Sequence, residues 1–148
     1  MTPVEVRMAG ESDLPAVYAL RHEVFVLGQD VPEDMERDEH DDGSDHAVAL
    51  AGGRVVGTGR LVPPALLGRI DGVAVVGRMA VAEAARRTGT GARVLAALEQ
   101  QARASGFAGV ELHAQVHARG FYERAGYTAF GEEYLEAGIL HVSMQKRF

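Results

Sequence analysis

The sequence predicts a mixed α/β protein whose sheet is mostly antiparallel, and three patterns in the chain indicate this fold class. An apolar, β-branched run at 73–81 leads through a glycine-rich turn into an amphipathic helix that ends near Gly106. A crossover of this kind places two strands in parallel. Two hairpin patterns, turning at 52–53 and at 136–138, add antiparallel pairs on either side.

Each remaining element follows from the spacing of apolar residues and from the glycines and prolines at its ends. In chain order we expect a strand at 4–8, a helix from about Asp13 to Leu27, strands at 47–51 and 54–62, a loop to about Gly72, the strand at 73–81, a helix opened by 86–91, a strand at 110–116, a helix at 117–126, and strands at 127–135 and 139–146. Gly57 and Gly59 indicate a bulge or a close backbone approach in the strand at 54–62.

Composition limits the classes of protein to which the chain can belong. Its 148 residues suit one domain spanning 1–148, and 47% hydrophobic with 24% charged residues is typical of a globular protein. The absence of cysteine excludes disulfides, thiolate catalysis and cysteine-ligated zinc. A net charge of −6 argues against nucleic acid as a partner. No apolar run approaches membrane-spanning length and no signal peptide is visible, so we expect a cytoplasmic protein without a membrane partner.

The turn at 86–91, RRTGTG, has the properties of an anion-binding site. Free N–H groups and the positive end of the helix dipole would face a ligand there, and glycine lets the backbone approach a phosphate. A Walker loop would need Lys-Ser or Lys-Thr after the last glycine, and a dinucleotide fingerprint would need a small residue at Val94. Both fingerprints are incomplete, which argues against a nucleotide-phosphate binder; an ordinary β–α turn with two exposed arginines stays open.

Residues 31–46 are unusually acidic, with Arg37 as the one counter-charge inside the segment. A solvated loop or short helix is one interpretation, because acidic runs are commonly exposed. A calcium loop is a second, but Ala49 stands where an EF-hand requires its bidentate glutamate. The third is a site that attracts a protonated amine and helps to remove its proton.

Two motifs carry a resemblance to a known family. Arg86-x-x-Gly89-x-Gly91 resembles the acyl-CoA-binding signature of the GNAT superfamily of N-acetyltransferases. The segment 121–127, FYERAGY, is similar to the F/L-Y-x-x-x-G-F/Y motif that follows the fifth strand in that family. Gln115-x-x-Ala118 stands where the family usually has N-x-x-A.

Flanking segments are similar to those of the ElaA-like subgroup of this superfamily, so the resemblance covers nearly the whole chain. These segments are R-x-x-V-F-V-x-x-Q-x-V-P at 21–32, E-x-D-x-x-D at 36–41 with His46 after it, GRMAV at 77–81 and GILH-x-x-M at 138–144.

The resemblance implies a GNAT fold: a mixed, mostly antiparallel sheet of six or seven strands with about four helices and a splayed, parallel central strand pair. It implies acetyl-CoA or another acyl-CoA as co-substrate, no metal, and a small-molecule or peptide amine as acceptor, in a monomer or homodimer. The fourth strand would hold the pantetheine arm and the turn the pyrophosphate. The implied cofactor-binding residues are Met79, Ala80, Val81, Arg86, Arg87, Thr88, Gly89, Thr90, Gly91 and Ala92.

The resemblance also implies direct transfer, in which a neutral amine attacks the thioester and Tyr122 protonates the departing thiolate. Val81 and residues 113–115 should lie near the acyl group. The expected acceptor-side residues are Phe25, Gln29, Glu33, Glu36, His113 and His141. Candidates for the proton acceptor are Glu33, Glu36, Asp38, His113 and His141, although His141 could equally be a surface residue of the hairpin. A catalytically silent acyl-CoA sensor or adaptor is the alternative function.

Overall fold

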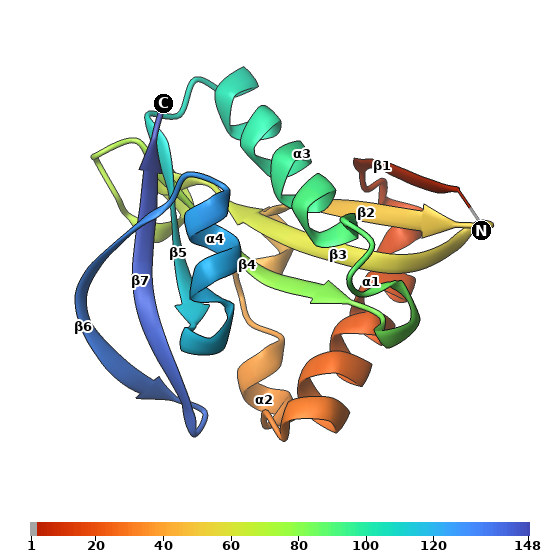
Figure 1. The fold of residues 1–148 in the computed structure, drawn as a ribbon. Coiled ribbons are helices and arrows are strands. Elements are labelled where there is room, and N and C mark those ends of the chain that lie inside the picture. The colour runs from red at the N-terminus through yellow and green to blue at the C-terminus, as the bar shows by residue number, and fades with distance from the viewer. Residues whose placement is uncertain (1–2) are drawn as a thin grey trace.

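The computed structural model describes residues 3–148, and its centre is a seven-stranded sheet in the order β1-β2-β3-β4-β5-β7-β6 (Figure 1). All neighbours pair antiparallel except β4 and β5, which confirms the predicted mixed sheet with one parallel pair. The strands are β1 Val4–Met8, β2 Asp45–Ala51, β3 Arg54–Val62, β4 Val73–Val81, β5 Gly109–Gln115, β6 Thr128–Glu136 and β7 Ile139–Arg147.

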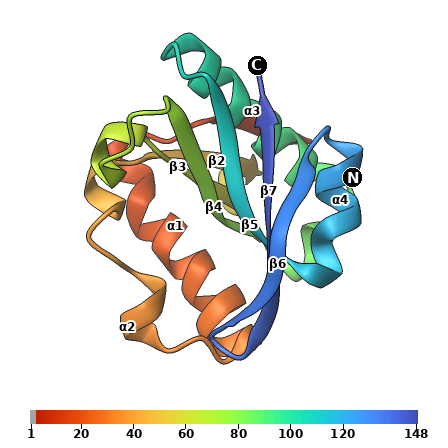
Figure 2. The same cartoon turned by 90° about the vertical axis from the view of Figure 1, so that its left-hand side faces the viewer.

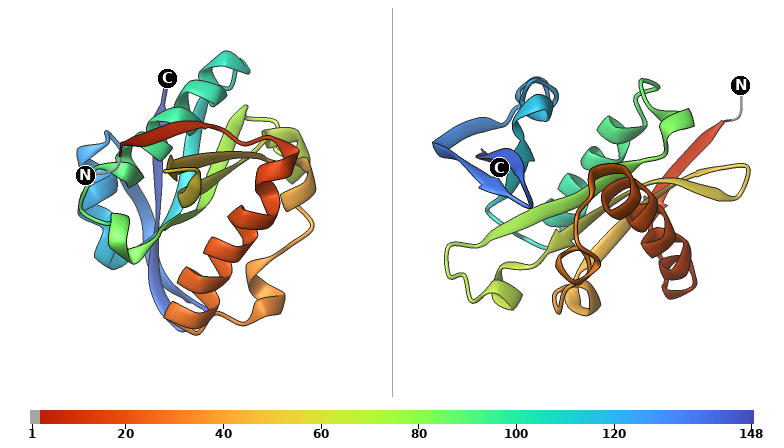
Figure 3. Two further views of the ribbon diagram at one scale, coloured as in Figure 1. Left: turned by 90° about the vertical axis from the view of Figure 1, so that its right-hand side faces the viewer. Right: turned by 90° about the horizontal axis from the view of Figure 1, so that it is seen from below.

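Helices cover both faces of the sheet, with α1 and α2 on one face and α3 and α4 on the other (Figure 3). Their bounds are α1 Leu14–Arg21, α2 Glu33–Glu36, α3 Thr90–Ala104 and α4 Arg119–Arg124. The apolar stripe of α3 is buried as predicted, since Val94, Leu95 and Leu98 are at most 1% exposed. No helix within residues 3–148 has the length and apolar character that crossing a lipid bilayer requires.

The helix predicted from about Asp13 to Leu27 forms, but its regular geometry changes along its length. A 3-10 turn at Glu11–Asp13 precedes α1, and a π-helical segment follows it at His22–Leu27. Segments of π-helix widen the backbone spiral and often occur at functional sites. In this protein the π-helical segment carries Val24 and Phe25 to the cleft described below.

The strands β4 and β5 pair over their first halves and then part. Their register runs from Val73 opposite Gly109 to Val76 opposite Leu112. Beyond this point β4 stays with β3 whereas β5 stays with β7, so the sheet divides into two wings. Figure 2 shows the two wings from the side of the β6–β7 hairpin, which extends past the end of β5.

A bulge in β4 accompanies this separation. Arg78 has φ 54°, and the β3–β4 register shifts between Thr58 and Arg60. Gly59 lies opposite the bulge, where an added Cβ would come within 2.6 Å of Met79 Sδ and 2.7 Å of Leu98 Cδ1. The β2–β3 register also shifts, between Ala49 and Leu50, so β3 itself contains the bulge that its glycines predicted, whereas the atoms close to Gly59 belong to side chains and not to backbone. Because a bulge bends its strand, the bulge in β4 helps to turn β4 away from β5.

Candidate functional site

A cleft of about 510 Å³ opens where β4 and β5 part. Its walls come from the π-helical segment, Met35 and Glu36 of α2, the second half of β4, the end of β5, α4 and the tip of the β6–β7 hairpin. Since α1 and α4 cover opposite faces, the lining comes from both faces of the sheet (Figure 3). Two reactants could therefore meet inside it from opposite sides.

One side of the cleft is formed by backbone. Met79, Ala80 and Val81 line the cleft, and the edge of β4 that faces β5 has no strand partner after Val76 within residues 3–148. Unpaired backbone N–H and C=O groups at such an edge require hydrogen-bond partners. A peptide-like ligand arm lying along this edge would supply them.

The turn after β4 presents a helix N-terminus. Gly89 has φ 81°, in the left-handed region that favours glycine, and α3 starts one residue later. The first backbone bond of the helix runs from the Arg93 N–H to the Gly89 carbonyl, so the N–H groups of Thr90 to Ala92 precede the helical bonding pattern. This arrangement can bind a phosphate or pyrophosphate group.

The side chains of the turn divide between structural roles and exposure. Arg86 lines the cleft and its Nε donates to the Val81 carbonyl at 2.9 Å, while Arg87 is exposed. The Thr88 hydroxyl binds the Ala85 carbonyl and lies 2.8 Å from that of Thr90. The threonines therefore hold the turn in shape and the arginines supply positive charge beside it.

Tyr122 enters the cleft from α4. Its side chain packs edge-on against Phe121 and Tyr127, and the residue is 9% exposed. Burial raises the pKa of the Tyr122 hydroxyl to about 12. No residue between 3 and 148 forms a hydrogen bond with this hydroxyl, so a neutral phenol lines the cleft with its proton free to be donated.

The opposite side of the cleft is formed by side chains from distant segments. Phe25 and Gln29 follow α1, and Gln29 exchanges amide hydrogen bonds of 2.8 and 3.5 Å with Gln115 at the end of β5. His113 and His141 also line the cleft, from β5 and β7. His141 is 8% exposed, so its interpretation as a surface residue of the hairpin is wrong.

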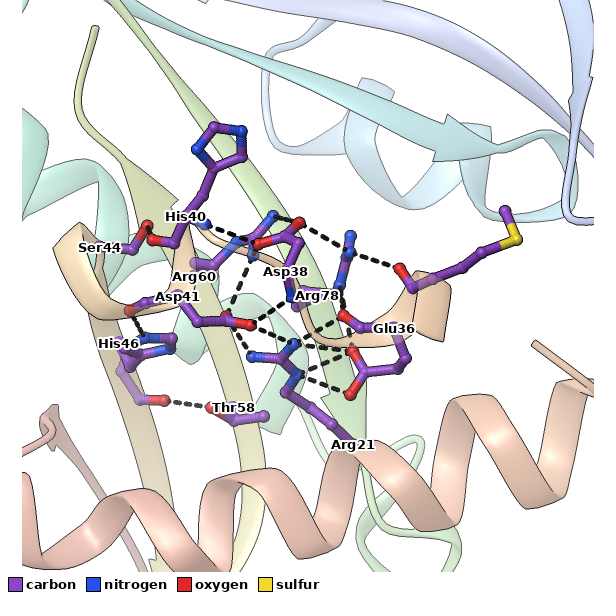
Figure 4. A network of polar contacts seen from close by, with 12 residues as sticks. Arg21, Glu36, Asp38, His40, Asp41, Ser44, His46, Thr58, Arg60 and Arg78 are labelled. Carbon is purple, nitrogen blue, oxygen red and sulfur yellow. Dashed lines mark hydrogen bonds and ion pairs between the residues drawn. The ribbon is translucent and has the colours of Figure 1, made fainter. Parts of the chain in front are cut away.

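The acidic segment packs on three arginines instead of extending into solvent (Figure 4). Arg21 is fully buried; its Nη2 lies 2.8 Å from Glu36 Oε2 and its Nη1 lies 2.7 Å from Asp41 Oδ1. Arg60 Nη1 donates to Asp38 Oδ1 at 2.7 Å and to Asp41 Oδ1 at 3.0 Å. The solvated-loop interpretation is therefore wrong for these carboxylates, although Asp34 and Asp42 are exposed.

The same network changes the interpretation of Glu36 and Asp38 as proton acceptors. Arg78 Nε binds Glu36 Oε2 at 3.1 Å and Arg78 Nη2 binds Asp38 Oδ2 at 3.2 Å. Burial alone would raise the pKa of Asp38, but the hydrogen bond and charge of Arg60, with the charge of Arg78, hold it below its usual range. Arginine N–H groups already occupy the oxygens of both carboxylates, so the geometry argues against both candidates.

Glu33, the third carboxylate considered as a proton acceptor, lies outside the cleft. Its side chain is 74% exposed and lies 2.7 Å from His22 Nε2.

Within residues 3–148 no group of three or more histidine, cysteine, aspartate or glutamate side chains could hold a metal ion. The calcium-loop interpretation therefore finds no site in the described part of the chain.

Sequence reasoning missed Arg60 and Arg78 as partners of the acidic segment. Both arginines interrupt strands that are otherwise apolar. A charged residue in a buried strand requires a buried partner of opposite charge, and the acidic segment has an excess of carboxylates. That combination was the available signal. Glu136, which lines the cleft from the end of β6, had no comparable signal.

Comparison with known proteins identifies the family. Residues 7–148 match the acetyltransferase (GNAT) domain. A relative from Bacillus subtilis (strain 168), named uncharacterized N-acetyltransferase YjcF, is 37% identical over 137 residues, which is 92% of this chain and 94% of that protein.

Solved structures agree with this assignment. An acyl-CoA N-acyltransferase from Pseudomonas aeruginosa is 29% identical, with a TM-score of 0.82 over 99% of both chains. Escherichia coli ElaA, which is 23% identical, shares the fold with a TM-score of 0.81 over 99% of this chain and 100% of that one. Together with the splayed β4–β5 pair, these matches show that the chain belongs to the GNAT family of N-acetyltransferases.

Proposed function

We propose that this N-acetyltransferase moves an acetyl group directly from acetyl-CoA to a primary amine, with Tyr122 as the general acid. The observation that carries the proposal is the position of Tyr122, whose neutral, unpartnered hydroxyl lines the cleft at the point where the sheet opens. A general acid must be protonated at neutral pH and free to donate, and Tyr122 meets both conditions.

The side of the cleft formed by backbone supports binding of the co-substrate. The free edge of β4 from Met79 to Val81 matches the alternating donors and acceptors of a pantetheine arm. The turn from Arg86 to Ala92 offers N–H groups and two arginine charges to the pyrophosphate. These contacts would place the thioester between the two wings of the sheet, near Val81 and Ala114.

The mechanism follows from the two-sided lining. The amine enters from the face of α1 and α2, in contact with Phe25, Gln29 and His113, and its lone pair attacks the thioester carbon. A β4 N–H stabilises the negative charge that develops on the carbonyl oxygen. As the carbon–sulfur bond breaks, the Tyr122 hydroxyl gives its proton to sulfur. The proton that nitrogen loses as the amide forms returns to the Tyr122 oxygen, which restores the enzyme.

Titration of the full chain with acetyl-CoA, followed by thiol-release assays against a panel of primary amines, tests the proposal. We expect saturable binding, and one thiol released per amide formed with at least one amine. A parallel series of longer acyl-CoA thioesters tests the preference for acetyl. Binding without transfer to any amine would contradict the proposal and favour an acyl-CoA sensor. Absence of binding would show that acetyl-CoA is not the co-substrate.

A further inference from the structure

We propose that His141 is the group that takes the proton from the acceptor amine, an assignment that rests on the transfer reaction proposed above. A lysine-like amine has a pKa near ~10.4 and is mostly protonated at neutral pH, so a proton must leave before nitrogen can attack. The ion pairs of Glu36 and Asp38 and the position of Glu33 outside the cleft leave histidines as the remaining candidates among those predicted.

The hydrogen bond of His141 determines which ring nitrogen is free. Nδ1 lies 2.7 Å from the Ile139 carbonyl oxygen, which can only accept, so Nδ1 carries the proton and donates it. In the neutral ring Nε2 then has a lone pair. A backbone carbonyl that fixes the tautomer in this way is a common means of orienting a basic imidazole.

The surroundings of His141 hold the ring in place and put a carboxylate beside it. Tyr134 stacks on it, with ring centroids 5.8 Å apart and planes inclined by 23°. Glu136 Oε2 lies 3.8 Å from Nε2, so a carboxylate lies beside the nitrogen that would take the proton. Both His141 and Glu136 line the cleft.

The sheet places His141 on the face from which the amine enters. In the β5–β7 register His141 is opposite Gln115, and residues opposite one another share a face. Gln115 bonds to Gln29 on the side of α1, while the next residue of β7, Val142, lies in the core beneath α3 and α4 with Tyr122. Base and acid would thus act from opposite faces of the sheet, on the entering nitrogen and on the departing sulfur respectively.

His113 lies on the same face but is less suited to the role. Its Nε2 lies 2.9 Å from the Glu111 carboxylate, which fixes that nitrogen as the donor, and its side chain is 41% exposed. The titratable groups around His141 are therefore Tyr134 and Glu136 on β6 and, beyond the Tyr134 ring, His113 on β5. His117 is held by Gln115 at 2.6 Å.

The proton balance is complete with these groups. An ammonium acceptor loses two protons as it becomes an amide. The first passes to His141 Nε2 and from the imidazolium to solvent at the open side of the cleft. The second returns to the Tyr122 oxygen, which has given its own proton to sulfur.

Steady-state transfer over a range of pH, compared between the wild type and His141→Asn, tests this assignment. Asparagine can still donate to the Ile139 carbonyl but cannot take a proton. We expect kcat/KM for an alkylamine to fall about 10²-fold at neutral pH, an effect at the low end of those known for general bases. Without the base, kcat/KM should keep rising with pH toward the pKa of the amine instead of levelling off, and the affinity for acetyl-CoA should stay within twofold. His40→Asn, which removes a histidine outside the cleft, should leave every parameter unchanged.

Two further measurements separate chemistry from folding. An amine that is already neutral at pH 7, such as trifluoroethylamine, should lose much less rate in His141→Asn than an alkylamine does. Glu136→Gln, at a side chain that is 57% exposed, should fold normally and lower transfer to an alkylamine less than His141→Asn does. Transfer by His141→Asn within threefold of the wild type, with an unchanged pH profile, would overturn the assignment alone. Absence of transfer by the wild type would overturn the proposed function and the assignment together.

Discussion

The two sides of the cleft are built in different ways. The side proposed for CoA comes from one continuous stretch, 79–92, and presents mainly backbone groups at a free strand edge and a helix N-terminus. The acceptor side is assembled from the π-helical segment after α1, the acidic segment, β5 and the last hairpin, and it presents side chains. A recognition site made of backbone can be identified in a local sequence, whereas a site made of side chains depends on tertiary packing.

The two sides also differ in how firmly they are held. The turn at 86–89 is exposed and has few partners, so substitutions there should change binding more than folding. On the acceptor side, Arg21, Glu36 and Asp41 form ion pairs at no more than 4% side-chain exposure. Substitutions in that network should first change the stability of the fold. The predictions that follow test this difference.

The largest expected effect is the loss of stability on replacing Arg21. Arg21→Met removes the fully buried cation that bridges Glu36 and Asp41, so Glu36 keeps only Arg78 and Asp41 only Arg60 as a charged partner, which costs about 3–5 kcal/mol of unfolding free energy. Urea denaturation followed by circular dichroism measures it. Arg7→Met is the matched control, since the Arg7–Asp13 pair is surface-exposed and screened by solvent, so its loss should change the unfolding free energy little. Equal losses in the two variants would contradict the account of the network.

A smaller loss of stability is expected when the pH is lowered. Burial alone would raise the pKa of Asp41, but hydrogen bonds from Arg21 and the Asp38 N–H, with the charges of Arg21 and Arg60, hold it well below the ordinary 3.8. The unfolded chain therefore binds this proton at higher pH than the folded one, so the stabilisation is present above about pH 4 and is lost as pH falls below it.

Urea midpoints measured between pH 7 and pH 2.5 test this expectation. The wild type should lose stability steeply below pH 4, whereas Asp41→Asn should start lower at pH 7 and decline less. Asp42→Asn is the control, because Asp42 is exposed and should reproduce the wild-type curve. Parallel curves for wild type and Asp41→Asn would show that Asp41 does not carry the acid sensitivity.

The smallest expected effect is a loss of acetyl-CoA affinity when the arginines of the turn at 86–91 are replaced. Replacing Arg86 and Arg87 together with alanine should weaken acetyl-CoA binding about fivefold at low salt, since exposed charge pairs contribute up to about 1 kcal/mol each. The difference should shrink as ionic strength rises, because salt screens exposed charges. Calorimetric titrations at two salt concentrations measure it. Arg103→Ala, at the opposite end of α3, should bind like the wild type, and a salt-independent loss in the double variant would argue against a phosphate contact.

The sequence predicted most of the fold and one side of the site, for identifiable reasons. Periodicity found all seven strands, because each is short, apolar on at least one face and bounded by glycine, proline or polar residues. The short helix that was one interpretation of the acidic segment forms as α2, but its bounds were not predicted, since four residues are too few to show a period. The contacts of Gln29 with Gln115 were not predicted either, because they join residues far apart in sequence. The register that brings His141 into the cleft depends on pairing that no local pattern encodes.

The central claim is that Tyr122 serves the departing thiolate and contributes little to holding the co-substrate. The direct measurement is kcat at saturating acetyl-CoA and amine, with the dissociation constant for acetyl-CoA, in Tyr122→Phe and the wild type. Phenylalanine keeps the edge-on contacts with Phe121 and Tyr127 and removes only the hydroxyl. We predict a fall in kcat of about 10²-fold with the acetyl-CoA affinity nearly unchanged. A kcat that survives while the affinity collapses would contradict the account and make Tyr122 a binding residue.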